Sequence, residues 1–146
     1  MFKHIMIPVD LAEKDKLKKA VKVAADLAQY YNALLTLVSV SGGLQGKVSH
    51  SNKEYGRLLS LYAGEIAQAH DIKVNSVNYS VPDPSVEVDQ KLIQAIEELN
   101  IDLAVMASHQ PHWVEYIVNS HGGKLARHAP ISVLLVRESL KFLAHK

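Results

Sequence analysis

The 146-residue chain contains no cysteine, which excludes disulfide scaffolds, thiol catalysis and cysteine-based zinc sites. It also lacks an excess of either charge, because 16 Lys and Arg residues oppose 15 Asp and Glu residues. A near-neutral chain has no electrostatic footprint for nucleic acid or an anionic membrane. No apolar run approaches the roughly 18 residues of a membrane helix, and the run Ile5–Val9 is too short for a signal peptide. We therefore expect a soluble, cytoplasmic protein with neither a nucleic-acid nor a membrane partner.

The residues that are present suit one globular domain over 1–146, with residues 139–146 as a tail that frays. Hydrophobic residues make up 48% of the chain, in short runs that alternate with amphipathic stretches. Such short apolar runs predict strands that are buried on both faces of a sheet. The predicted strands are Ile5–Val9, Leu34–Val40, Val74–Val81, Leu103–Ala107 and Ile131–Val136.

Between these strands the spacing of apolar residues changes to that of a helix. It predicts helices over residues 17–31, 55–67 and 88–99, and a short helix over 120–128 that Pro130 ends. Ser85 is the predicted N-cap of the third helix. The polar segment Ser41–Asn52 is a predicted surface loop.

The alternation of strands and helices predicts an α/β fold, a five-stranded, parallel, doubly wound sheet with helices on both faces. Val74–Val81 alternates more than the other strands and carries Asn and Ser, so we place it at an edge. A doubly wound sheet reverses once, here between the first and fourth strands, and ligands bind outside the carboxyl ends of the strands at that point. Asp10 follows the first strand, and the segment Ala107–Ser120 follows the fourth.

The segment after the fourth strand reaches a predicted helix N-terminus, where unpaired N–H groups and the helix dipole attract phosphate. Ser120 is placed to cap this helix or to donate its hydroxyl group to an anion. Gly122 and Gly123 in the first turn have two explanations: the close approach of a ligand or backbone, or a poorly formed first turn.

Three stretches carry a resemblance to a known family: IMIPVD at residues 5–10, LAVMASH at 103–109, and NS followed by RHAPISVLLVR between 119 and 137. On these motifs the chain resembles the universal stress protein family. The resemblance implies a five-stranded α/β fold and, in many members, an adenine nucleotide at the switch point without rapid turnover. It also implies a homodimer, and the apolar strand Ile131–Val136, a predicted sheet edge, is where we expect two copies to pair.

The resemblance further implies the residues of the site. Asp10 matches the family aspartate that faces the nucleotide, and Val40 matches the position beside the adenine. The alternative for Asp10 is a carboxylate that caps the first helix. The full expected site for ATP or AMP, with or without Mg²⁺, is Pro8, Val9, Asp10, Val40, Met106, Ala107, Gln110, Asn119, Ser120 and His121.

The chain departs from the family's G-x-x-G and G-[S/T] motifs at each glycine, where Ala107, Gln110 and Asn119 stand instead. The methyl group of Ala107 is tolerable at negative φ, and Asn119 adopts a left-handed conformation more readily than most residues. The side chain of Gln110 either fills the phosphate space or donates its NH₂ group to an anion. Ser108-His109-Gln110 and Trp113 also resemble the family branch that is regarded as not binding ATP. The alternative function is thus a dimeric interaction protein that binds no nucleotide.

No general base, nucleophile elbow or complete phosphate loop is visible, so we expect no catalytic residues, with a slow ATPase as a third hypothesis. GGLQGK at residues 42–47 is not a P-loop, because its glycine spacing is short and Val48 follows Lys47. His109, His112, His121 and His128 are more simply exposed histidines than metal ligands, so no metal is expected.

Overall fold

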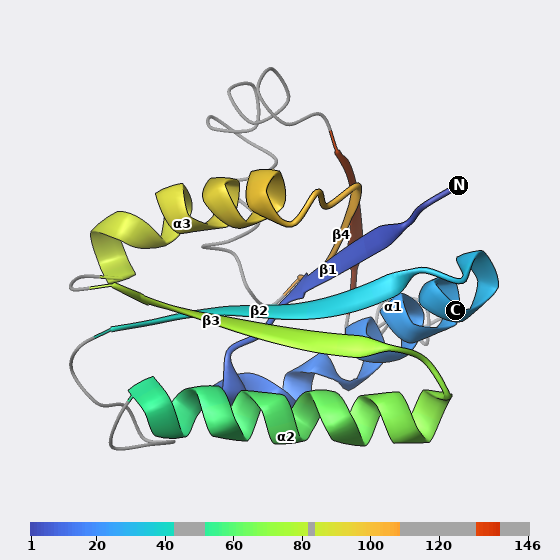
Figure 1. Ribbon diagram of the computed structural model, residues 1–146, viewed down its shortest axis with the longest axis horizontal. Helices are drawn as coiled ribbons and strands as arrows, with labels where there is room; N and C mark the ends of the chain where they lie inside the picture. The colour runs from blue at the N-terminus through green and yellow to red at the C-terminus, as the bar shows by residue number, and fades with distance from the viewer. Residues whose placement is uncertain (43–51, 82–83, 109–130, 138–146) are drawn as a thin grey trace, which may run out of the picture.

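The computed structural model of the protein describes residues 1–42, 52–81, 84–108 and 131–137 (Figure 1). Its elements in chain order are β1 (His4–Pro8), the 3₁₀ segment η1 (Leu11–Leu17), α1 (Lys18–Tyr31), β2 (Leu34–Gly42), α2 (Asn52–His70), β3 (Val74–Val81), α3 (Pro84–Glu98), β4 (Leu103–Ala107) and β5 (Ser132–Val136). The predicted fourth helix and the tail lie outside the described residues.

The five strands form one sheet in the order β3-β2-β1-β4-β5, and all neighbours pair in parallel. The chain starts in the centre, builds outward to β3, and then returns to the other side of β1 to build β4 and β5. The predicted α/β fold is confirmed, and so are the edge position of β3 and the reversal between β1 and β4.

Helices cover both faces of the sheet (Figure 1), with α1 and α2 on one face and α3 on the other. Alternate residues of each strand therefore enter different cores. In β1, Ile5 and Ile7 pack with α1 and α2, whereas Met6 packs with Leu92 and Ile96 of α3. Because both faces are covered, the central strands are continuously apolar rather than alternating.

Several boundaries differ from the sequence-based expectation, and three of them have a physical explanation or consequence. Ser41 belongs to β2 rather than to a loop, because it pairs with Ser80 of β3, and the edge strand extends the ladder past the apolar run. The helix α3 begins at Pro84, so Ser85 is a helical residue and the predicted N-cap is wrong. Proline suits the first turn of a helix because its missing N–H group would have no partner there. The first helical stretch begins in 3₁₀ geometry over Leu11–Leu17 before α1 starts.

The amino end of β1 is held by a small polar network. The Asp102 carboxylate accepts hydrogen bonds from the backbone N–H groups of Lys3 (2.9 Å) and His4 (3.2 Å). The His4 ring bonds the Leu99 carbonyl oxygen (2.7 Å) and the buried Thr36 hydroxyl group (2.6 Å). These contacts join β1 and β2 to the residues between α3 and β4. They fix the position of the first residues of β1 relative to these neighbours.

Candidate functional site

The central feature of the carboxyl end is that β1 and β4 separate there. Their ladder has only the pairs Ile5–Leu103 and Met6–Ala104 among the described residues. By contrast, β1 pairs with β2 as far as Pro8, and β4 pairs with β5 as far as Ala107. Pro8 has no N–H group to donate to a ladder. The strands therefore part where the sheet reverses, which is the position at which doubly wound sheets bind ligands.

The backbone that follows β1 hydrogen-bonds to β2, and the backbone that follows β4 hydrogen-bonds to β5. The Val9 N–H group donates to the Val38 carbonyl oxygen of β2 (2.8 Å), and the Ser108 N–H group donates to the Val136 carbonyl oxygen of β5 (2.9 Å). The β1 side and the β4 side of the gap are thus each anchored to a different strand.

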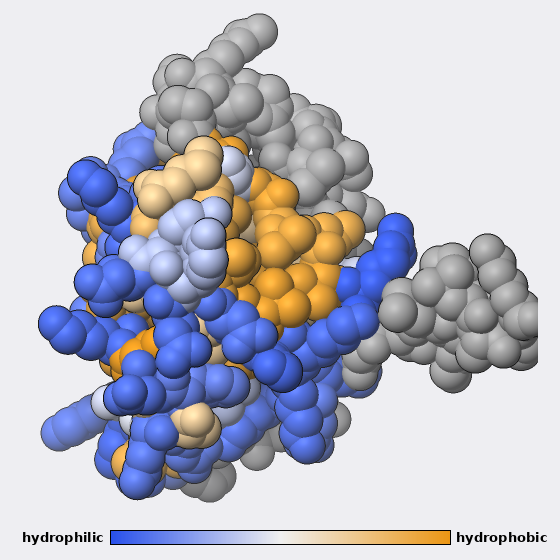
Figure 2. Space-filling model, turned by 90° about the vertical axis from the view of Figure 1, so that its right-hand side faces the viewer, coloured by the Kyte–Doolittle hydropathy of each residue, from blue (hydrophilic) through white to orange (hydrophobic). Residues whose placement is uncertain are grey.

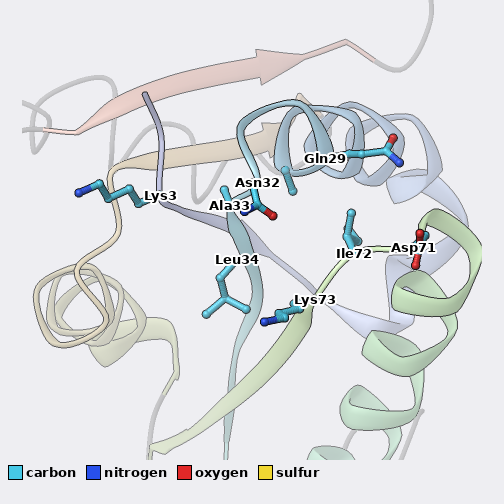
Figure 3. A pocket seen from close by; sticks show the side chains of 9 residues that line it. Lys3, Gln29, Asn32, Ala33, Leu34, Asp71, Ile72 and Lys73 are labelled. Carbon is cyan, nitrogen blue, oxygen red and sulfur yellow. The ribbon is translucent and has the colours of Figure 1, made fainter.

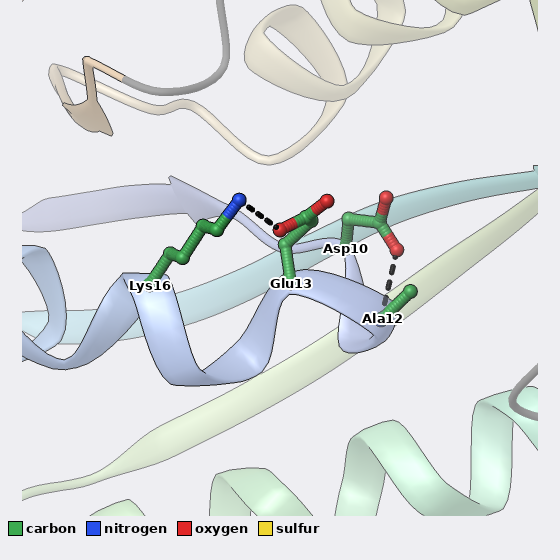
Figure 4. A network of polar contacts seen from close by, with 4 residues as sticks. All are labelled: Asp10, Ala12, Glu13 and Lys16. Atoms are coloured by element: carbon green, nitrogen blue, oxygen red, sulfur yellow. Dashed lines mark hydrogen bonds and ion pairs between the residues drawn. The ribbon is translucent and has the colours of Figure 1, made fainter.

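Asp10 follows β1 by two residues and caps η1 (Figure 4). Its Oδ1 atom accepts from the Ala12 N–H group (3.0 Å), and its carbonyl oxygen accepts from the Glu13 N–H group (2.9 Å). The capping interpretation of Asp10 is therefore confirmed. In Figure 4 the second carboxylate oxygen points away from the turn, and the side chain is exposed. The cap thus occupies one oxygen atom, and the other is directed away from the helix.

A polar network behind Asp10 was not predicted from the sequence. The Tyr55 hydroxyl group of α2 accepts a hydrogen bond from the Leu11 N–H group (3.0 Å), and the nearby Ser39 side chain lowers the pKa of Tyr55. Ser39 in turn donates to Asn78 Oδ1 (2.8 Å). The apolar spacing that predicts α2 assigns Tyr55 to the core, and no motif marks its hydroxyl group. Burial raises the pKa of Tyr55 above 10.0 and the nearby Asp10 charge raises it further, so the phenol is neutral at physiological pH.

Six of the ten predicted site residues lie in the described part of the chain, and all six are at the carboxyl end of the sheet. Asp10 is exposed and Val40 is half-buried. The other four, Pro8, Val9, Met106 and Ala107, are buried. Val40 has the same strand parity as Val38, which packs in the α3 core, so the two share a face. Of these six residues, Asp10 and Val40 are therefore the two whose side chains are accessible to a ligand.

The remaining predicted residues, Gln110, Asn119, Ser120 and His121, lie outside the described residues, as do the other three histidines of that region. The binding role of all ten residues, in both halves of the site, stays a prediction. Within the described ranges, no group of three or more His, Asp or Glu side chains is arranged to hold a metal ion. None of the helices described there is long and apolar enough to cross a bilayer.

A hollow of about 630 Å³ lies at the opposite end of the sheet, beside the ends of α1 and α2 (Figure 3). Its polar lining residues include Lys3, Gln29, Asn32, Asp71 and Lys73. In Figure 3 the Lys3 side chain extends away from the other labelled groups, so the charged groups do not converge on one point. Convergent polar groups are what distinguish a ligand site from a surface hollow, and this hollow lacks them.

Comparison with known proteins agrees with this geometry. Residues 1–137 match the model of the universal stress protein family, and the chain belongs to that family. It is 29% identical to universal stress protein A of Salmonella typhi over 123 residues, which cover 77% of this chain and 79% of that protein. It is 26% identical to universal stress protein G of Salmonella typhimurium over 147 residues, covering 94% and 100%.

Solved structures share the fold. A universal stress protein from Burkholderia pseudomallei superposes with a TM-score of 0.63 at 21% identity, covering 92% of this chain and 96% of that one. A universal stress protein in complex with cAMP gives a TM-score of 0.62 at 17% identity, with coverages of 94% and 98%. One from Archaeoglobus fulgidus in complex with dAMP gives 0.63 at 15% identity, with coverages of 92% and 97%.

Proposed function

We propose that this universal stress protein binds an adenine nucleotide, ATP or AMP, in the gap between β1 and β4 and acts as a cytoplasmic stress-response module without rapid turnover. The observation that carries the proposal is the parting of β1 and β4 next to an exposed carboxylate, Asp10, with one oxygen directed away from its own turn. The cAMP and dAMP complexes of structures with the same fold support the choice of an adenine nucleotide.

In this proposal the base and ribose lie on the side of Asp10 and Val40, with the backbone at Pro8, Val9, Met106 and Ala107 beneath them. The phosphates lie toward Gln110, Asn119, Ser120 and His121.

Thermal unfolding with adenosine, AMP and ATP, each with and without Mg²⁺, tests the proposal. A ligand at one hundred times its Kd adds about 2.7 kcal/mol to stability, which raises Tm by on the order of 8–10 °C for a chain of this size. We expect a rise with at least one adenine nucleotide and none with a pyrimidine nucleoside. Equal Tm values under all conditions would favour the interaction protein that binds no nucleotide.

We also propose that the protein is a homodimer through β5. This edge strand exposes Leu134 (38%) and Leu135 (36%), and Figure 2 shows hydrophobic surface gathered on the side of the molecule where β5 lies. An apolar edge strand offers both unpaired backbone groups and hydrophobic surface to a second copy. Leu134→Arg should convert dimer to monomer in sedimentation velocity, whereas Leu61→Arg on α2, where the side chain is 54% exposed, should not. A dimer that survives Leu134→Arg places the interface elsewhere.

A further inference from the structure

The turn that carries Asp10 depends on a residue from another element. A helix start leaves its first N–H groups without partners inside the helix. Here the Ala12 and Glu13 N–H groups are satisfied by Asp10 itself, through its side chain and its carbonyl oxygen. The Leu11 N–H group is satisfied by the hydroxyl oxygen of Tyr55, at 3.0 Å. The N–H group of Leu11, the residue directly after Asp10, is therefore held by a side chain of α2.

The Tyr55 hydroxyl group lies beside other polar side chains. The Ser39 hydroxyl group of β2 lowers the pKa of Tyr55, and it donates a hydrogen bond to Asn78 Oδ1 of β3 (2.8 Å), which also accepts from the Ser41 hydroxyl group (3.2 Å). Polar side chains thus extend from the Asp10 turn through α2 and β2 to the edge strand. A hydroxyl group carried on a half-buried ring is a firmer anchor for a backbone amide than a water molecule would be, because an ordered water must also lose its mobility.

We infer that Tyr55 is a positioning residue of the nucleotide site: its hydroxyl group pins the Leu11 amide and thereby fixes where the outward oxygen of Asp10 meets the ligand. The inference rests on the proposed function. Tyr55 itself does not contact the nucleotide in this assignment and acts through the turn. Because Asp10 belongs to the base and ribose side, the effect should be the same for adenosine, AMP and ATP, which differ only in their phosphates.

Tyr55→Phe removes the hydroxyl group and keeps the ring packed, and Tyr62→Phe is its matched control. Tyr62 is a buried tyrosine on the same helix that has the Lys14 ammonium group above its ring (4.6 Å) and the Glu65 and Asp15 charges nearby. In titration calorimetry, Tyr55→Phe should weaken adenosine, AMP and ATP by a common factor of about threefold to tenfold, the size of one hydrogen bond. Tyr62→Phe should change each Kd by less than about twofold.

Two readouts separate positioning from a general loss of structure. In ¹⁵N–¹H spectra of the free protein, Tyr55→Phe should move the Leu11 and Ala12 amide resonances and leave those of β4 in place. In the Asp10→Ala background, Tyr55→Phe should no longer alter adenosine affinity, since the group it positions is gone. If the wild type binds and Tyr55→Phe has the same Kd, the role of Tyr55 is overturned and the proposed function is not. The same follows if Tyr55→Phe still weakens adenosine binding to the same extent in the Asp10→Ala background. A wild-type protein that binds none of the three ligands overturns the proposed function and this role with it.

Discussion

Asp10 has two roles in this account, and one pair of substitutions separates them. Its Oδ1 atom caps η1 at 3.0 Å from the Ala12 nitrogen, and its other oxygen is assigned to the ligand. Asp10→Ala removes both roles. Asp10→Asn keeps an acceptor for the cap, because Asn is as good an N-cap as Asp, and removes the negative charge that a ligand hydroxyl or amino group would meet.

The two roles differ in size and in assay. Loss of an N-cap costs about 1 kcal/mol of unfolding free energy. In urea denaturation, Asp10→Ala should therefore lower the unfolding free energy by about this amount, and Asp10→Asn should leave it within about 0.5 kcal/mol of the wild type. A hydrogen bond to a charged group contributes about 1.5–3 kcal/mol, so both variants should weaken adenosine by about tenfold or more in titration calorimetry.

Asp15→Asn is the control for charge alone, since Asp15 is also exposed and lies in η1 but is not the cap. It should change neither quantity measurably. If Asp10→Asn unfolds as easily as Asp10→Ala, the Asp10 side chain does not stabilise η1 as a cap. If Asp10→Asn binds adenosine as tightly as the wild type does, the Asp10 charge does not contact the ligand.

Three further predictions follow from other parts of the molecule. The double change Gln110→Gly, Asn119→Gly should lower the Kd for ATP by about tenfold or more, and the Kd for AMP by less, as measured by titration calorimetry. An equal Kd for ATP in the wild type and the double variant would mean that this loop does not contact phosphate. Asp102→Ala should lower the unfolding free energy in urea by about 1–2 kcal/mol, because the backbone N–H groups of Lys3 and His4 lose their acceptor. Asp102→Asn, which keeps an acceptor, should lower it by less. An unchanged urea midpoint in Asp102→Ala would show that Asp102 does not anchor β1. Burial raises the folded-state pKa of Tyr55, Tyr62 and Tyr79 above the ordinary value of 10.0, so the stability from these neutral phenols is complete below pH 10.0 and declines as the pH rises through the folded-state pKa values. Tyr55→Phe should make this decline less steep in urea midpoints measured across that pH range. An identical decline in the variant and the wild type would contradict the prediction.

The fold was predictable from the sequence because burial on both faces of the sheet leaves a strong pattern. Val74–Val81 and Leu103–Ala107 have the predicted bounds, and the alternation of strands with helices was enough to place the reversal between β1 and β4. Boundaries set by partners rather than by composition were missed. Ser41 extends β2 only because Ser80 lies opposite, and α3 begins at Pro84 because proline tolerates the first turn.

The candidate site was predictable in location but not in construction. The position of Asp10 after the first strand and the doubly wound topology identify the end of the sheet. The sequence does not reveal that the β1–β4 ladder stops after Met6–Ala104, because hydrogen bonding between strands far apart in the chain leaves no local pattern. Nor does it single out Tyr55, because a tyrosine in an apolar stripe has the same spacing whether or not its hydroxyl group meets a backbone amide 44 residues away.

The proposed entry of an adenine nucleotide between β1 and β4 is tested most directly by titrating the ¹⁵N-labelled protein with AMP and recording ¹⁵N–¹H correlation spectra. These spectra report the position of the ligand as well as its affinity. We predict saturable shifts of the amide resonances at Val9, Asp10, Leu11 and Ser108, with no change at Ala33 and Ile72 beside the hollow at the opposite end. Shifts confined to Ala33, Ile72 and Lys73, or no shifts at any AMP concentration, would contradict it.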